Sequence, residues 1–195
     1  MIRVCDIVFS LFGLLFLSPL FLIVALWIVL DNPGPVFYRQ QRVGKDGKDF
    51  GLLKFRSMRV GADKMSLITI GDRDPRVTRA GYYIRRFKID ELPQLWNVLT
   101  GDMSLVGPRP EVRRYVDLYT DEQRKVLSVR PGITDYASIE YIDENRLLAQ
   151  SSNPDKTYIE EIMPAKIALN MRYINHQTLV EYLKILFLTM TKIIR

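Results

Sequence analysis

The N-terminal apolar segment constrains this chain more than any other stretch of its sequence. Residues 7–30 carry no charged side chain. As a straight helix they would be about 36 Å long, which exceeds the ~30 Å hydrocarbon core of a bilayer. A secretory signal peptide fits poorly, because the run is too long and Asp31-Asn-Pro-Gly-Pro35 is not a small-residue cleavage site. We therefore predict a segment that enters a membrane.

Ser18 and Pro19 lie near the middle of this segment. Proline removes one backbone hydrogen bond and clashes with the preceding turn, so the helix should kink or break there. Three arrangements compete: a kinked helix that spans the bilayer, a re-entrant hairpin that leaves on the face it entered, and a buried helix of a soluble protein. The third is the least favoured, and the residues alone do not separate the first two. In both, the Ser18 hydroxyl can satisfy a carbonyl freed by the bend.

The charge of the chain indicates its orientation and its class of partner. Only Arg3 precedes the apolar segment among basic residues, whereas Arg39, Arg42, Lys45 and Lys48 follow it closely. The positive-inside rule then places residues 31–195 in the cytoplasm. A net charge of +6 implies anionic partners. Beside a membrane segment, lipid headgroups and phosphorylated substrates are favoured, and no nucleic-acid partner is expected, because no nucleic-acid motif is present.

Metal and nucleophile sites of several kinds are excluded by composition. Cys5 is the only cysteine and His176 the only histidine. A structural zinc site and a Cys-His or Ser-His catalytic pair are therefore not expected.

The rest of the chain predicts a mostly α fold with a small β-hairpin element. Residues 36–43 and 50–56 are predicted strands around a turn at 44–47. Residues 61–80 are predicted to be a loop, and 107–110 and 130–134 ordered turns. Residues 120–123 have capping-box spacing. Helices are expected over 82–88, 92–99, 111–119, 120–129, 159–175 and from 178 to the end.

The last helix has an apolar face made of Leu179, Leu183, Leu186, Phe187, Met190 and Ile194. Such a face can pack in a core or lie at a membrane interface as an amphipathic helix. Both interpretations remain open.

The adjacent carboxylates Asp90 and Glu91 are the leading candidates for chemistry. Such a pair in a basic setting can divide the work of nucleophile, metal ligand and proton acceptor. In the simpler structural interpretation, Asp90 caps the following helix and Glu91 pairs with Arg85 or Lys88. Taken alone, the pair favours that interpretation.

Basic residues near Gly- and Pro-marked turns strengthen the chemical interpretation. Arginine forks match phosphate oxygens bidentately, and several together would suit a diphosphate. An aspartate beside such a site would hold Mg²⁺, here Asp90. Any single arginine could instead form a surface ion pair with Asp102, Glu111 or Glu122. The candidate phosphate-binding residues are Lys54, Arg56, Arg85, Arg109 and Arg130.

Four motifs in this order resemble the bacterial sugar transferases, the monotopic phosphoglycosyl transferases that act on polyprenol phosphate. The motifs are Lys54-Phe-Arg-Ser-Met58, the run from Asp90 to Leu99, Gly101 to Pro110, and Arg130-Pro-Gly-Ile-Thr134. The resemblance covers nearly the whole chain, and the chain is similar to the minimal form of the family, without an additional transmembrane bundle.

The resemblance implies a reaction and roles for the pair. The family transfers a phospho-sugar from a UDP-sugar to a polyprenol phosphate, typically undecaprenyl phosphate, and releases UMP in the first membrane step of glycoconjugate synthesis. Asp90 would attack the sugar-proximal phosphorus to form a covalent intermediate and would coordinate Mg²⁺. Glu91 would deprotonate the polyprenol phosphate.

The resemblance also implies an architecture. Ser18-Pro19 would bend residues 1–32 into a re-entrant membrane hairpin, whose two ends both stay cytoplasmic. Residues 33–195 would form a compact cytoplasmic catalytic domain with amphipathic interfacial helices. This domain would lie against inner-membrane lipid, on the cytoplasmic face of the bacterial inner (cytoplasmic) membrane.

One departure from the family pattern affects the choice of sugar. Many members follow Pro-Gly-Ile-Thr with Gly, whereas this chain continues with Asp135 and differs through Asp143. The sugar and the pathway therefore stay open, as does the oligomeric state, a homodimer included. The competing function is a non-catalytic, membrane-anchored adaptor that binds anionic lipid.

Overall fold

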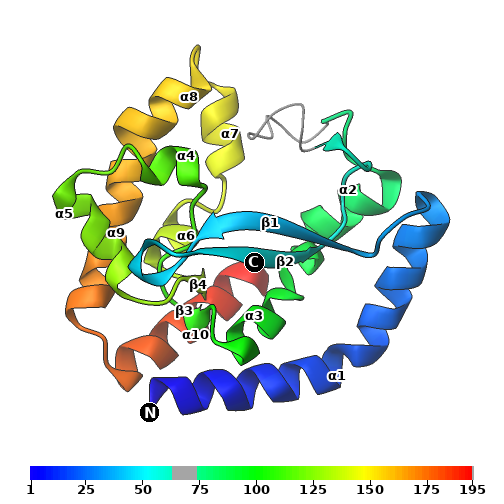
Figure 1. Cartoon of the computed structure of the whole chain (residues 1–195), viewed down its shortest axis with the longest axis horizontal. Helices are drawn as coiled ribbons and strands as arrows, with labels where there is room; N and C mark the ends of the chain where they lie inside the picture. The colour runs from blue at the N-terminus through cyan, green and yellow to red at the C-terminus, as the bar shows by residue number, and fades with distance from the viewer. Residues whose placement is uncertain (63–73, 195) are drawn as a thin grey trace.

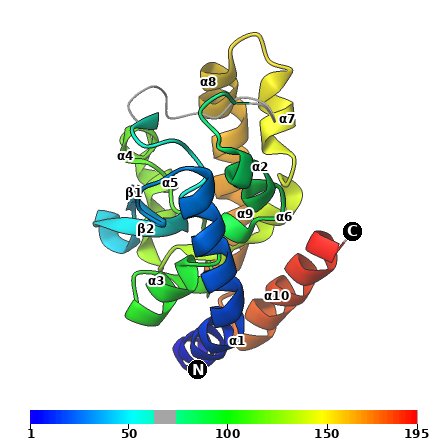
Figure 2. The same cartoon turned by 90° about the vertical axis from the view of Figure 1, so that its right-hand side faces the viewer.

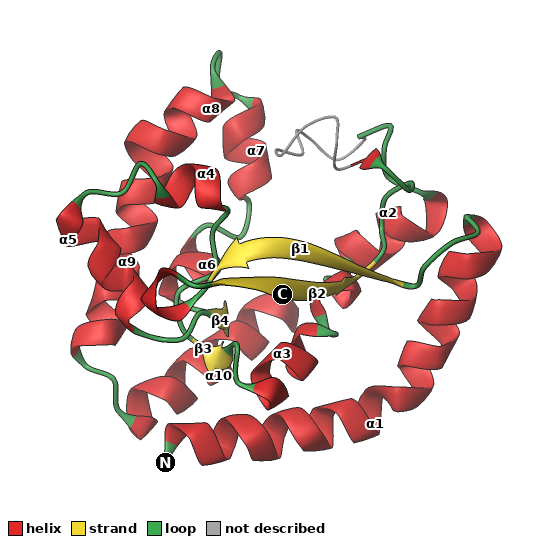
Figure 3. Cartoon of the chain, viewed as in Figure 1, coloured by secondary structure: helices red, strands yellow, loops and turns green. Residues whose placement is uncertain are grey.

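Helices make up most of the chain, and short strands lie among them, as Figures 1 and 3 show. The computed structural model describes residues 1–62 and 74–194. The predicted mostly α fold with a small β element is confirmed. The predicted loop over 61–80 lies largely outside the described residues.

The apolar segment forms a single helix that bends. Helix α1 (Ile2–Asp31) contains Pro19 and changes direction partway along, as Figure 1 shows. Pro19 has no N–H to offer the Leu15 carbonyl, and the Ser18 hydroxyl donates to that carbonyl instead, with an O···O distance of 2.8 Å. The compensation expected of Ser18 is confirmed, and the expected break takes the form of a bend within one helix.

Both ends of α1 are fastened to the rest of the protein. Near the N-terminus, the buried Asp6 carboxylate accepts hydrogen bonds from the Ser104 hydroxyl, the Leu105 N–H and the Tyr182 hydroxyl, each at 2.9 Å. At the C-terminus, Asp31 accepts a hydrogen bond from the Ala80 N–H at 2.9 Å. The helix therefore wraps along one side of the body rather than projecting from it, as the two views in Figures 1 and 2 agree.

The predicted hairpin is present. Strands β1 (Phe37–Val43) and β2 (Asp49–Phe55) pair antiparallel, with Tyr38 opposite Lys54. A 3-10 turn, η1 (Lys45–Gly47), joins them and requires positive φ at Asp46 (56°) and Gly47 (73°).

The structure contains a second strand pair that was not predicted from the sequence. Strands β3 (Ser104–Val106) and β4 (Gly132–Thr134) pair in parallel, so the prediction of a turn over 130–134 is wrong for its last three residues. Each strand is too short to show an alternating pattern. Their backbones approach so closely that a Cβ on Gly132 would lie 2.1 Å from the Gly107 nitrogen. Glycine is needed here for space.

Helices surround these strands. Helix α2 (Arg79–Arg86), η3 (Ile89–Glu91) and α3 (Gln94–Thr100) follow the hairpin. The capping box at Thr120–Gln123 is confirmed at the start of α5. The remaining elements are α4 (Arg113–Val116), α5 (Asp121–Arg124), η4 (Lys125–Ser128), α6 (Tyr136–Glu140), α7 (Glu144–Ala149), α8 (Pro154–Thr157), the π-helical turn η5 (Tyr158–Ile162), α9 (Met163–Asn175) and α10 (Leu179–Ile194).

Three groups of buried side chains hold the elements together. One lies around Val98, Met103 and Tyr173 beneath β3, and it includes residues of α10. A second joins Tyr115 to Tyr158 and the α9 helix, and a third packs the C-terminal half of α1 against β2 and α2. The hydrophobic effect thus ties α1 and α10 to the same body.

Helix α10 packs one face in the core, and its interfacial role stays a prediction. Tyr182 and Ile185 are fully buried, whereas other apolar side chains face outward. The exposed ones are Val180, Leu183, Phe187 and Met190. One face therefore packs in the core, and the other offers apolar surface of the kind an interfacial helix presents.

Candidate active site

Asp90 is a buried carboxylate that no described residue binds. It lies on η3, which follows a left-handed turn at Lys88 with φ of 57°. Its side chain is 8% exposed, and it accepts no hydrogen bond and forms no ion pair with the described residues. Helix α3 begins at Gln94, after the N-cap residue Pro93, and has no side-chain cap. The interpretation of Asp90 as a helix cap is therefore wrong, and its oxygens remain available.

Glu91 is held by two cations. The Arg109 guanidinium binds both of its oxygens, through Nη1 at 3.1 Å and through Nη2, and the Lys54 ammonium lies 3.4 Å from Oε1. The expected pairing with Arg85 or Lys88 is replaced by partners from β2 and from the turn after β3. The site therefore joins three segments distant in sequence.

The surroundings separate the two carboxyl groups. Burial, and then the Glu91 charge, raise the pKa of Asp90, although Lys54 and Arg85 oppose this shift. Burial would also raise the pKa of Glu91, but Arg109 and Lys54 outweigh it and hold that pKa well below its usual range. Glu91 is thus a paired anion, whereas Asp90 has no cation in contact among the described residues. Such divergence is typical of carboxyl pairs with different chemical roles.

The pair faces a large cavity rich in cations. Its volume is about 1470 Å³, and its walls come from the hairpin, α2 and the α6–α7 segment. A cavity of this kind suits an anionic ligand. Of the predicted site residues, it is lined by Lys54, Arg56, Arg85, Asp90, Glu91 and Arg109.

Two of the predicted phosphate-binding arginines have other partners. Arg56 is buried and donates to the Asn32 side chain at 3.1 Å and to the Asn32 and Pro33 carbonyls, so it fastens the chain that leaves α1. Arg130 donates from Nε to the Gly101 carbonyl at 2.8 Å and does not line the cavity. The structure does not bring Arg130 together with Asp90 and Glu91.

Arg42 lines the cavity and Asn97 supports one of its walls, although sequence reasoning assigned neither to the site. Arg42 lines the cavity from β1, and its guanidinium lies near that of Arg109. Asn97 pairs with the free edge of β2: its Oδ1 accepts from the Leu53 N–H at 2.8 Å, and its Nδ2 donates to the Gly51 carbonyl at 2.9 Å. This bond pair fixes the strand that carries Lys54 against the helix that follows Glu91.

The donor set fits Mg²⁺ shared with a phosphorylated ligand. Among residues 1–62 and 74–194, no three His, Cys, Asp or Glu side chains gather as a metal cage. Mg²⁺ commonly takes one or two carboxylates and completes its shell with water and substrate phosphate oxygens. Asp90 offers such a carboxylate, since its oxygens accept no hydrogen bond from the part of the chain that the structure describes.

Comparison with known proteins relates this chain to one family. The sequence pattern of the family described as "Bacterial sugar transferase" matches residues 1–195. The chain is 50% identical over 120 residues to the putative undecaprenyl-phosphate N-acetylgalactosaminyl 1-phosphate transferase of Bacillus subtilis (strain 168), covering 62% of this chain and 67% of that protein.

Two further relatives are longer proteins. The chain is 46% identical over 142 residues to the UDP-N-acetylgalactosamine-undecaprenyl-phosphate N-acetylgalactosaminephosphotransferase of Aeromonas hydrophila, covering 70% of this chain and 33% of that protein. It is 37% identical over 193 residues to the UDP-glucose:undecaprenyl-phosphate glucose-1-phosphate transferase of Escherichia coli (strain K12), covering 97% of this chain and 39% of that protein. The aligned part thus spans only a third to two fifths of these two relatives.

Proposed function

The chain belongs to the bacterial sugar transferase family, and on that premise we propose that it transfers a sugar 1-phosphate from a UDP-sugar to undecaprenyl phosphate, with release of UMP. The names of its relatives support these substrates. The observation that carries the proposal is Asp90, a buried carboxylate with no bonded partner in residues 1–62 and 74–194, at the wall of a cation-lined cavity. A carboxylate in that setting can act on phosphorus.

In the first step, an Asp90 oxygen attacks the sugar-proximal phosphorus. The phosphoanhydride bond breaks, its electron pair leaves with UMP, and the sugar phosphate remains on Asp90 as an acyl phosphate. The positive charges of Lys54 and Arg109, which line the cavity, stabilise the negative charge on the phosphate oxygens. Asp90 would hold Mg²⁺, which would supply positive charge for the phosphate oxygens and would offset the burial that raises the pKa of this carboxyl.

In the second step, Glu91 takes a proton from the acceptor phosphate. The acceptor oxygen attacks the same phosphorus, and the bond to Asp90 breaks to regenerate the carboxylate. Incoming phosphates compete with Glu91 for Arg109 and Lys54, which frees its oxygens for this role. Two steps suit two substrates that arrive separately, one from water and one from the bilayer.

The attachment of α1 supports a re-entrant arrangement. A spanning helix would place its ends on opposite faces of a bilayer core of ~30 Å. Here Asp6 and Asp31 both bond to the same body. Within the described residues, α1 is the one helix long and apolar enough to enter a bilayer. We therefore place the body on one face, the cytoplasmic face of the bacterial inner membrane, with α1 bent into the bilayer and the outer face of α10 against its surface.

Cysteine labelling in sealed vesicles tests this topology. A cysteine inserted after Met1, in a Cys5→Ser background, should react with a membrane-impermeant maleimide only from the cytoplasmic side. A cysteine replacing the exposed Lys48 serves as the cytoplasmic reference. Labelling of the N-terminal cysteine only from the outer side would refute the re-entrant arrangement.

The reaction itself is tested with the purified protein and undecaprenyl phosphate in detergent. UDP-N-acetylgalactosamine and UDP-glucose are supplied separately, with and without Mg²⁺, and UMP is measured. We expect Mg²⁺-dependent UMP release from at least one donor of a wider UDP-sugar panel. A protein that binds anionic vesicles but releases no UMP from any donor would instead be the membrane-anchored adaptor.

A further inference from the structure

Arg109 lies in a turn that is held on both sides. Pro108 and Pro110 flank it and restrict the backbone. On the β4 side, the Gly132 N–H donates to the Pro108 carbonyl at 2.9 Å, and the Arg109 N–H donates to Asp135 at 2.9 Å. These bonds fix the backbone from which the guanidinium reaches Glu91.

On the β1 side of this turn, Glu111 forms several contacts. Its carbonyl accepts from the Val43 N–H at 2.8 Å, and its Oε1 accepts from the Val112 N–H at 2.7 Å. The Arg42 guanidinium donates from Nη1 to Glu111 Oε1 at 3.2 Å and to the Pro110 carbonyl at 3.1 Å. The Arg42 guanidinium therefore links the Pro110 carbonyl to the Glu111 side chain.

Glu111 also sets the charge balance of the site. Arg42, Lys54 and Arg109 lie close enough to repel one another. Glu111 gives Arg42 a carboxylate of its own, so Arg42 does not compete for Glu91. Arg42 is partly buried, so leaving its charge without a carboxylate would be costly.

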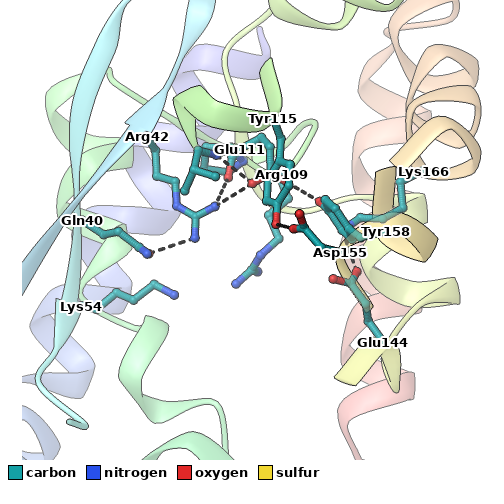
Figure 4. Close-up of polar contacts among 12 residues, drawn as sticks. Gln40, Arg42, Lys54, Arg109, Glu111, Tyr115, Glu144, Asp155, Tyr158 and Lys166 are labelled. Atoms are coloured by element: carbon teal, nitrogen blue, oxygen red, sulfur yellow. Dashed lines mark hydrogen bonds and ion pairs between the residues drawn. The ribbon is translucent and has the colours of Figure 1, made fainter. Parts of the chain in front are cut away.

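The other oxygen of Glu111 is held from the C-terminal helices. The Tyr158 hydroxyl donates to Glu111 Oε2, as Figure 4 shows with Glu111 between Arg42 and Tyr158. Tyr158 opens the π-helical turn η5, a form of helix that often occurs at functional sites. Its ring packs at 4.8 Å from Tyr115, and the Lys166 ammonium lies 5.5 Å from the ring. Burial and Glu111 raise the pKa of Tyr158, so it stays a donor.

From these contacts we infer that Tyr158 and Arg42 are positioning residues that act through Glu111 to hold the Arg109 turn, and thus the guanidinium on Glu91 and the donor phosphates. The C-terminal helices contribute few residues near Asp90 and Glu91. Through the Tyr158 hydroxyl, they nevertheless support the groups that are proposed to react. This inference rests on the transfer reaction proposed above.

A matched pair of tyrosines isolates this hydroxyl. Tyr115 is buried against Tyr158, and its own hydroxyl donates at 2.7 Å to Asp155, which pairs with Arg114 at the surface. We expect Tyr158→Phe to lower kcat by about tenfold through misplacement of Arg109, and Tyr115→Phe to leave kcat unchanged. The thermal unfolding midpoints of the two variants should agree, which separates positioning from general stability.

A double-mutant cycle tests the route through Glu111. In a Glu111→Gln background, Tyr158→Phe should cause little further loss, because the acceptor it served has already changed. Arg42→Lys keeps the charge but cannot hold Glu111 and the Pro110 carbonyl together, so kcat should again fall about tenfold. Arg42→Lys changes the other partner of the Glu111 side chain. It therefore tests the inference even if Tyr158→Phe folds poorly.

Distinct outcomes separate this inference from the proposed reaction. Wild-type protein that releases no UMP from any donor contradicts the reaction. Active wild-type protein with equal kcat values for Tyr158→Phe and Tyr115→Phe overturns the positioning role alone. A full additional tenfold loss in the Glu111→Gln background also overturns it, because Tyr158 would then act by another path.

Discussion

Asp90→Asn should abolish UMP release, with a loss of at least about 10³-fold in kcat. An amide cannot attack phosphorus as a carboxylate does, and it is a weaker ligand for Mg²⁺. The substitution preserves the shape of a side chain that accepts no hydrogen bond from the described residues, so the fold should persist. The measurement is UMP formed with saturating donor, Mg²⁺ and undecaprenyl phosphate.

The matched control is Asp117→Asn. Asp117 is exposed and lies 3.9 Å from Arg113 in a surface ion pair, so this change should leave the rate unaltered. An Asp90→Asn protein that turns over at a rate near that of the wild type would remove Asp90 from the mechanism. The cationic cavity would then have to serve a direct transfer between the two substrates.

Glu91→Gln should separate the two steps. Loss of the general base should lower turnover by about 10²- to 10⁴-fold, whereas the sugar-phosphate adduct should still form. Adduct formation should itself be slower than in the wild type, because Arg109 and Lys54 lose the anion that orders them. Rapid mixing with donor alone measures the first step, and later addition of undecaprenyl phosphate measures the second.

Glu122→Gln is the control for this change, because Glu122 pairs with Lys125 on the exposed surface. Loss of the adduct together with turnover would place Glu91 in the first step. Undiminished turnover would show that the acceptor phosphate needs no base from the protein.

The sequence singled out the candidate pair, but it did not indicate which cations hold Glu91. Adjacent acidic residues among turn-marked cations are visible in one dimension, and Asp90, Glu91, Lys54 and Arg109 do meet in space. The local spacing suggested Arg85 and Lys88 as partners of Glu91. The actual partner Arg109 is brought close by the β3–β4 pair, whose three-residue strands leave no pattern in the sequence.

Arg42 shows the same limit. On an alternating strand it resembles a solvated charge, and it becomes a site residue only because the turn through Pro110 folds over it. Arg56 shows the reverse, since its motif suggested phosphate binding and its donors hold Asn32 and Pro33. Long-range packing decides such cases, and single-sequence patterns do not record it.

The bend in α1 was predictable, and its attachment was not. Proline chemistry indicates a kink at Pro19, and the Ser18 bond to the Leu15 carbonyl follows from the residue types. The partners of Asp6, Ser104 and Tyr182, lie far along the chain, so the sequence pattern does not reveal this attachment. Hydropathy alone therefore could not choose between a span and a hairpin.

Mass spectrometry of the protein with donor and Mg²⁺ but no acceptor shows whether Asp90 carries a covalent intermediate. We expect a mass increase of one sugar phosphate, located on the peptide that contains Asp90, with UMP released in equal amount. Addition of undecaprenyl phosphate should remove the increase. UMP released only when the acceptor is present, with no adduct on Asp90 under any condition, would contradict the account.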